Sequence, residues 1–305
     1  PFLRGLDFYR KAVVLQKKYN TKGLHISNAI QTNGTCLDEK WAEFLKENNF
    51  LVGISLDGTG FIHDRFRVDG QGEGSFVRVM EGIGLLKKYG VDFNILTVVH
   101  AMTAKKITQI YDFYKQNGFT YLQFIPCLNP IAREQERFAY TLTPKAYGHF
   151  LKTLFDLWYN DLKSGVIVHI QQFEEYVKML LLMPANVCGM NGVCSCQHVV
   201  EADGEVYPCD FYVLDGYRLG SLNEVSFDRI NEKRKEIRFI EESARMHEDC
   251  GHCKYAPICR GGCRRHRMPK NCFCMSYYEF FDYAIHRLEE AAALFQNACG
   301  DILHR

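Results

Sequence analysis

The residues best suited to chemistry in this chain are nine cysteines in its second half. They are Cys188, Cys194, Cys209, Cys250, Cys253, Cys259, Cys263, Cys272 and Cys274. The four from Cys250 to Cys263 are separated by two, five and three residues. Loops this short bring thiolates together at a small entropic cost, and thiolates are ligands of zinc and of iron–sulfur clusters. The spacing therefore predicts one or more metal or iron–sulfur centres.

A disulfide framework is the alternative use of so many cysteines. It is typical of small secreted domains, whereas this chain has 305 residues, of which 47% are hydrophobic. Its start, PFLRGLDFYRK, lacks the pattern of a signal peptide. No run approaches the ~18 consecutive apolar residues that read as a membrane span. We therefore expect a cytoplasmic protein without a membrane partner, in which thiols stay reduced and can bind metal.

The rest of the composition is that of an ordinary globular protein. The formal net charge is +1, which gives no field to attract nucleic acid, and we expect no such partner. The length suffices for one large and one smaller domain. We place the boundary near residue 170, so that the domains comprise 1–170 and 171–305, and we expect a monomer.

The first part of the chain alternates expected strands and helices. Strands are expected at 24–30, 51–58, 91–99 and 121–126, and helices at 6–19, 38–48, 75–89, 104–117 and 144–163. Strands separated by such helices pair in parallel with right-handed crossovers, as in an open sheet or a barrel. Functional loops then follow the carboxyl ends of the strands. Here those loops are 31–35, 55–58, His100 and 127–129.

The pattern changes after a further helix expected at 172–183. Cys- and Gly-rich turns follow, and only VVEADGEVYPC reads as a hairpin, turning at Asp203 and Gly204. That hairpin would return Cys209 toward the loop of Cys188 and Cys194. The last helix is expected at 276–298. A region with so little apolar sequence needs another source of stability, and cluster binding would supply it.

These cysteines and their neighbours resemble a known family. The order C-x5-C, G-x-V-Y-P-C-D, C-x2-C-x5-C-x3-C and a final cysteine looks like the SPASM extension of radical S-adenosylmethionine enzymes. Within that superfamily the chain is similar to the anaerobic sulfatase-maturating enzymes. The similar segments are QTNGT, SLDG followed by IHDRFR, CGMNGVCSCQ, YPCDFYVLD and CRGGCRR. The resemblance spans nearly the whole chain.

The resemblance implies both a fold and an activity. The fold would be α/β, a partial (β/α)6 TIM-like barrel followed by a Cys-rich SPASM domain and a C-terminal helix. The activity would be reductive cleavage of S-adenosylmethionine and conversion of a Cys or Ser of a sulfatase polypeptide to C-formylglycine under anaerobic conditions. Auxiliary clusters would accept an electron, and a flavodoxin or ferredoxin would be the electron donor. The alternatives are another SPASM peptide maturase, which crosslinks or epimerises, and a non-catalytic iron–sulfur or zinc module.

The resemblance also implies the cluster ligands. It assigns two auxiliary 4Fe-4S clusters to this chain. The ligands of the first would be Cys188, Cys194, Cys209 and Cys263, and those of the second Cys250, Cys253, Cys259 and Cys274. The family alone assigns Cys263 to the first cluster. Cys274 is preferred to Cys272 because of its distance from the following SYYEFF.

Four further residues receive roles from the family. Asp210, directly after Cys209, matches its proton acceptor, and Arg67 would pair bidentately with the methionine carboxylate of S-adenosylmethionine. Ser55 would meet a ribose hydroxyl, and Leu128 would contact this cofactor through its backbone. Ordinary alternatives are a turn-capping Asp210, a solvated Arg67 and a Ser55 that only forms a turn.

The family's catalytic cluster is not accounted for by these residues. Its C-x3-C-x2-C motif does not occur in the sequence, and the chain begins at Pro1 rather than at methionine. We expect a preceding segment that carries this third cluster in the intact enzyme. A degenerate homologue is the alternative.

The cations near the last cysteines and the isolated cysteines allow two further predictions. The cations of the segment 259–267 would either stabilise clusters with a net charge of about −2 or form a solvated basic face. They are Arg260, Arg264, Arg265, His266 and Arg267. Cys36, Cys127 and Cys299 lack a cysteine at ligand spacing, and we expect them to be buried like other small hydrophobic residues.

Overall fold

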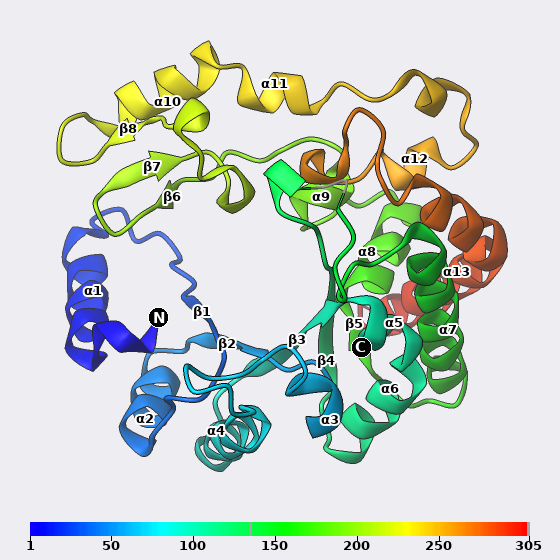
Figure 1. Ribbon diagram of the computed structural model, residues 1–305, viewed down its shortest axis with the longest axis horizontal. Helices are drawn as coiled ribbons and strands as arrows, with labels where there is room; N and C mark the ends of the chain where they lie inside the picture. Colours follow the sequence, from blue (N-terminus) through cyan, green and yellow to red (C-terminus); the bar gives the residue numbers. More distant parts are fainter. Residues whose placement is uncertain (134–135, 304–305) are drawn as a thin grey trace. The chain divides into compact units, whose positions relative to one another are not determined.

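A computed structural model describes residues 1–133 and 136–303 of the chain (Figure 1). The chain divides into two compact units, Pro1–Gln172 and Phe173–Arg305. We refer to them as unit 1 and unit 2. No helix in the described ranges combines the length and the apolar character that a membrane span requires.

Unit 1 contains a parallel sheet of five strands in the order of the chain. The strands are β1 (Ala29–Thr32), β2 (Leu51–Ser55), β3 (Phe93–Val99), β4 (Tyr121–Pro126) and β5 (His169–Ile170). Figure 1 shows α2, α4 and α6 along one side of this sheet. This arrangement is that of the wall of a β/α barrel, so the predicted α/β fold class is confirmed.

The helices of unit 1 follow from local signals in the sequence. They are α1 (Leu6–Tyr19), α2 (Glu39–Glu47), α3 (Gly60–His63), α4 (Phe76–Tyr89), α5 (Ala101–Lys105), α6 (Ile107–Gln116) and α7 (Pro144–Lys163), with 3-10 turns at Phe2–Arg4 and Ile131–Arg133. The Asp38 side chain accepts a hydrogen bond from the backbone N–H of Trp41 and so caps α2. Gly90 ends α4 in the left-handed conformation. The long helix α7 buries Phe150, Leu151 and Leu154 as part of the core.

In unit 1 one strand was predicted with the wrong start and another was not predicted. The strand expected at 24–30 begins only at Ala29. The Asn20 side chain accepts the backbone N–H of Leu24 and donates to its carbonyl, which holds the residues before Ala29 outside the sheet. Strand β5 was not predicted at all. Its signal was the β-branched apolar run at 166–170, which directly precedes α8 (Gln171–Leu180).

Unit 2 has a smaller antiparallel sheet and several short helices. The strands are β6 (Val199–Val200), β7 (Glu205–Tyr207) and β8 (Gly220–Ser221). The helices after α8 are α9 (Cys188–Asn191), α10 (Phe227–Glu236), α11 (Phe239–Ser243), α12 (Ala256–Cys259) and α13 (Cys274–Leu303). The predicted hairpin is confirmed, with Gly204 at φ 90° in its turn.

Apolar side chains of unit 2 gather in several places, among them the rings of Tyr212, Tyr217 and Phe239. Beside the small sheet, Val206, Leu219 and Ile230 form a buried cluster. Between α8 and α13, the Tyr176 ring lies 5.9 Å from that of Phe280 and 4.9 Å from that of Phe281. Tyr255, between Cys253 and Cys259, joins this last group, because its ring lies 5.6 Å from that of Phe281.

Candidate cluster and cofactor sites

The carboxyl ends of β1 and β2 frame a cavity of about 300 Å³ in unit 1. Ser55, the last residue of β2, lines it together with Gln31, Thr32 and Asn33, which end β1 and begin the loop after it. The sequence placed these segments at strand ends, and the structure brings them together. Arg67 and Leu128 are not among the lining residues of this cavity.

Arg67 lies in the loop after α3 and is not a solvated arginine. Its Nε donates to Oδ2 of Asp57 at 2.5 Å, and its Nη2 donates to Oδ1 of the same carboxylate at 3.2 Å. Asp57 is buried and also accepts the backbone N–H of Val98 at 2.8 Å. The sequence reasoning missed Asp57. Its signal was an acidic residue two positions after a strand, in SLDG, with an arginine ten residues later.

His100 and Leu128 follow the next two strands. His100 is buried and caps α5, because its Nδ1 accepts the backbone N–H groups of Met102 and Thr103. Within the described residues its Nε2 is buried without a hydrogen-bond partner. Leu128 is half-buried in the loop after β4. The polar and loop residues named from the sequence thus lie where the parallel strands end, as in other α/β sites.

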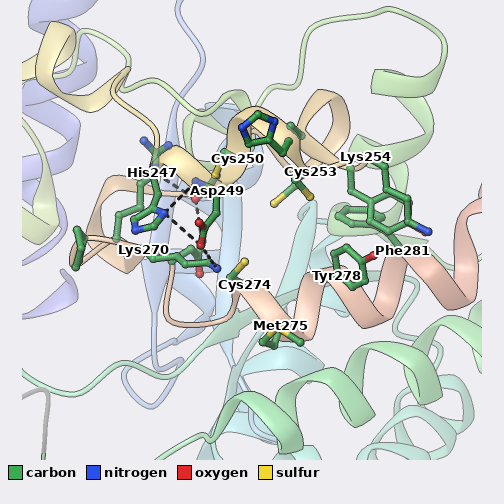
Figure 2. A pocket seen from close by; sticks show the side chains of 18 residues that line it. His247, Asp249, Cys250, Cys253, Lys254, Lys270, Cys274, Met275, Tyr278 and Phe281 are labelled. Carbon is green, nitrogen blue, oxygen red and sulfur yellow. Dashed lines mark hydrogen bonds and ion pairs between the residues drawn. The ribbon is translucent and has the colours of Figure 1, made fainter.

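Four cysteines of unit 2 line one cavity of about 540 Å³. They are Cys250, Cys253, Cys259 and Cys274. Figure 2 shows the sulfur atoms of Cys250, Cys253 and Cys274 around a common space. Burial, together with the charges of the other three thiolates, raises the pKa of Cys259 to about 11. Cys272 does not line this cavity, so the structure places Cys274 and not Cys272 beside the other three thiols.

The second group of thiols comprises Cys188, Cys194, Cys209 and Cys263. Burial raises the pKa of Cys263, and the charges of Cys188 and Cys194 raise it further. Burial likewise raises the pKa of Cys209 to about 12, with a contribution from Cys263. Each of these thiols therefore lies within electrostatic reach of another member of the group.

Two glycines allow the loops of this group to approach each other. A Cβ on Gly189 would lie 3.1 Å from the Cβ of Cys263, and one on Gly192 would lie 2.3 Å from the carbonyl oxygen of Arg260. Gly192 also has a positive φ of 73°. Side chains at these positions would push the loop of Cys188 and Cys194 away from that of Cys263.

The four thiols that line one cavity could serve as the ligands of a cluster. A zinc ion needs its four ligands at one centre, whereas in a 4Fe-4S cluster each thiolate binds a different iron atom. Four thiols spread around one cavity therefore suit a cluster.

Asp210 stands beside the thiol of Cys209 at an exposed position. It begins the 3-10 turn Asp210–Tyr212, and its Oδ1 accepts a hydrogen bond from the Cys209 thiol at 3.3 Å. In a cluster-bound state this thiol is a thiolate ligand without the proton, so Asp210 would be free to accept a proton from elsewhere.

Of the two alternatives for the cations at residues 259–267, the solvated basic face is wrong, and the stabilisation of clusters stays a prediction. The Arg267 guanidinium donates to backbone carbonyls in three segments, among them Gly192 at 2.8 Å, Ser243 at 2.7 Å and Gly261 at 3.1 Å. The Arg264 guanidinium lies 4.6 Å from the ring centre of Phe239 and 5.4 Å from that of Tyr212. These cations connect segments of unit 2, because the short turns leave carbonyls and rings for them to contact.

The prediction of burial is wrong for two of the isolated cysteines, Cys36 and Cys127. Cys36 is exposed and lines the cavity at Ser55, while Cys127 is only half-buried. Both lie in loops at strand ends, where the chain leaves the core. The side chain of Cys299 lies outside the described residues.

Two family models match these two regions. Residues 2–114 match the radical SAM superfamily, and residues 188–254 match SPASM, an iron–sulfur cluster-binding domain. The fold, the thiol groups and these matches together define an iron–sulfur protein of the radical S-adenosylmethionine class.

Similar proteins narrow this class. A cysteine-type anaerobic sulfatase-maturating enzyme of Clostridium perfringens is 47% identical over 299 residues, which cover 96% of this chain and 81% of that enzyme. A serine-type enzyme of Bacteroides thetaiotaomicron is 33% identical, over 92% of this chain and 73% of that enzyme. A solved structure described as native anSMEcpe with bound AdoMet and Cp18Cys peptide matches 97% of this chain and 84% of that chain, with a TM-score of 0.94 and 47% identity. The chain belongs to the anaerobic sulfatase-maturating enzymes.

Proposed function

We propose that this enzyme converts a cysteine of a sulfatase polypeptide to C-formylglycine, using S-adenosylmethionine and 4Fe-4S clusters. The observation that carries the proposal is the 47% identity to a cysteine-type enzyme over 96% of the chain. The serine-type relative is 33% identical, which favours cysteine over serine as the target. The similar solved structure, described as containing AdoMet and a Cys peptide, supports the same ligands.

The cysteines would divide into two ligand sets. Cys188, Cys194, Cys209 and Cys263 would hold the first cluster, and the four thiols that line the cavity of Figure 2 would hold the second. When bound, the clusters would supply a place for an electron removed from the substrate. A flavodoxin or ferredoxin would supply the electron that starts the reaction.

Asp210 would act as the general base. S-adenosylmethionine would supply the radical that takes a hydrogen atom from Cβ of the target cysteine. Loss of one electron to an auxiliary cluster and of the thiol proton would then give a carbon–sulfur double bond, which water converts to the aldehyde with release of sulfide. Asp210 would take that proton through its carboxylate, which the adjacent ligand Cys209 fixes in place. In unit 1, Ser55, Arg67 and Leu128 would bind S-adenosylmethionine through a hydroxyl, a guanidinium and a backbone group.

Iron analysis tests the ligand sets. Anaerobically reconstituted protein should bind about four iron and four sulfide per auxiliary cluster. Cys274→Ser should remove one cluster, whereas the matched variant Cys272→Ser should keep both. Loss of a cluster in Cys272→Ser alone would contradict the assignment.

Turnover tests the reaction and the base. Full-length gene product with Asp210→Asn should form aldehyde about 10²- to 10⁴-fold more slowly, the range of general base catalysis, with its iron content unchanged. Asp215→Asn, in the next 3-10 turn, is the matched control.

Mass spectrometry of paired Cys and Ser peptides should show faster conversion of the Cys peptide. A crosslinked or epimerised product would overturn the proposed function.

A further inference from the structure

A closed ring of hydrogen bonds joins four residues beyond the carboxyl end of β2. The carboxylate of Asp57 accepts two hydrogen bonds from the Arg67 guanidinium. The backbone N–H of Asp57 donates to Nδ1 of His63 at 3.2 Å, and Nε2 of His63 lies 3.0 Å from Oγ of Ser75. The Ser75 hydroxyl donates to the backbone carbonyl of Arg67 at 2.8 Å, which closes the ring.

The hydrogen bonds of this ring have a single direction. Because Nδ1 of His63 accepts a backbone N–H, the proton of the neutral ring must be on Nε2, which donates to Ser75. The Ser75 hydroxyl then has its own hydrogen for the Arg67 carbonyl. His63 is 1% exposed, and burial lowers its pKa, so the neutral form persists near pH 7.

The ring is anchored to the sheet and to its own loop. The backbone N–H of Val98 in β3 donates to Oδ1 of Asp57. The backbone N–H of Ser75 donates to the Arg67 carbonyl at 3.2 Å, and that of Phe76 donates to Oδ1 of Asp64 at 2.8 Å. The loop from α3 to α4 is therefore held against the strand ends at several points.

The guanidinium keeps one edge for another partner. It has five N–H groups, and Asp57 accepts from the edge formed by Nε and Nη2. The edge formed by Nη1 and Nη2 has the same spacing and can donate two hydrogen bonds to a second carboxylate. The Arg67 side chain is 24% exposed, whereas the Asp57 side chain that occupies the other edge is 3% exposed.

We propose that Asp57 is a positioning residue, supported by His63 and Ser75, that orients Arg67 so that its second edge meets the carboxylate of S-adenosylmethionine. This inference rests on the contact between Arg67 and that carboxylate in the proposed function. Asp57 also neutralises part of the Arg67 charge, which by itself weakens attraction for a second carboxylate. A positioning role therefore predicts that removing the Asp57 charge weakens cofactor binding, and simple neutralisation predicts the opposite.

Binding of two ligands separates these effects. Isothermal titration of the reconstituted full-length protein compares S-adenosylmethionine with its decarboxylated analogue. Asp57→Asn should weaken binding of S-adenosylmethionine about tenfold, the value of one hydrogen bond to a charged group, and should leave binding of the analogue unchanged. Ser75→Ala, which keeps the ion pair, should give a smaller loss of the same ligand selectivity. Ser164→Ala, at the end of α7, is the matched control.

Arg67→Met distinguishes failure of this inference from failure of the proposed function. If Arg67→Met binds S-adenosylmethionine as the parent does, the proposed cofactor contact is wrong. If Arg67→Met loses selectivity for the carboxylate while Asp57→Asn keeps or tightens binding, only the positioning role is overturned. Should Asp57→Asn fail to fold, Ser75→Ala decides: equal effects on both ligands, or none, would contradict the proposal.

Discussion

The two units hold their candidate site residues by different means. In unit 1, Ser55, Asp57 and His100 lie at or just beyond the ends of parallel strands, whose register the sheet fixes. Buried helix residues such as Leu154 support that sheet. In unit 2, most of the cysteines lie in turns or at the ends of one-turn helices, while Cys274 begins the long helix α13. The apolar cluster beside the small sheet comprises Val206, Leu219 and Ile230. We therefore expect unit 1 to form its site before any ligand binds, and unit 2 to gain stability from its clusters.

Unit 2 replaces a continuous core partly with arginine contacts. Arg267 alone donates to the carbonyls of Gly192, Ser243 and Gly261. Gly192 lies between Cys188 and Cys194, Gly261 lies between Cys259 and Cys263, and Ser243 ends α11. Hydrogen bonds to a charged donor are stronger than neutral ones. Burial, with a smaller contribution from the neighbouring thiols, raises the pKa values of Cys259 and Cys263 and disfavours the metal-free thiolate state.

Removal of iron should have the largest effect and should act on one unit. Chelation of reduced protein should abolish amide protection throughout residues 188–274, because cluster binding supplies folding free energy there. Amides of β2, β3 and β4 should keep their protection, since they belong to a parallel sheet with its own core. Hydrogen exchange followed by mass spectrometry of peptides measures both. Equal protection of unit 2 with and without iron would show that its arginine contacts and small cores suffice.

The same contrast explains how far the sequence could be read. Periodicity gave four strands and most helices of unit 1 because apolar residues there face a core, but it missed the two-residue β5. In unit 2 cysteine spacing indicated clusters, and the hairpin was recognised from Asp203 and Gly204. The contacts of Arg267 and Asp57 were not predicted, because periodicity does not reveal which groups a polar side chain contacts. Arg267 donates to backbone carbonyls, and Asp57 accepts from the Arg67 guanidinium and from the backbone N–H of Val98.

A substitution that creates a cavity in the core of unit 1 should destabilise the protein without changing its iron content. Leu154 is fully buried in α7, and Leu154→Ala should lower the free energy of unfolding by about 2–5 kcal/mol. Leu24→Ala, at a residue that is 65% exposed, is the matched control and should change it little. Denaturant titration gives the stabilities, and iron analysis should give the same content for both variants. Loss of iron in Leu154→Ala would show that the clusters depend on the core of unit 1.

Replacing Arg267 should have a somewhat smaller effect on stability, together with a loss of iron. Lysine keeps the charge but cannot reach carbonyls in several segments at once. We expect Arg267→Lys to cost about 2–3 kcal/mol, the value of hydrogen bonds to a charged group, and to lower the iron content. Arg229→Lys is the matched control, because Arg229 makes exposed ion pairs with Glu232 and Glu236, which contribute little. Full iron content in Arg267→Lys would separate this residue from cluster binding.

The smallest expected effect concerns the pH dependence of unit 1. Burial lowers the pKa of His63 in the folded protein from 6.5; Arg67 lowers it too, and Asp57 and Asp64 oppose the shift. As the pH falls below 6.5, the unfolded chain therefore binds a proton that the folded protein does not, and stability decreases until the folded pKa is reached. His63→Gln removes this term, so its melting temperature should fall less than that of the parent between pH 7.5 and pH 5. Thermal unfolding monitored by circular dichroism measures the difference, and parallel curves would show that His63 does not remain neutral in the fold.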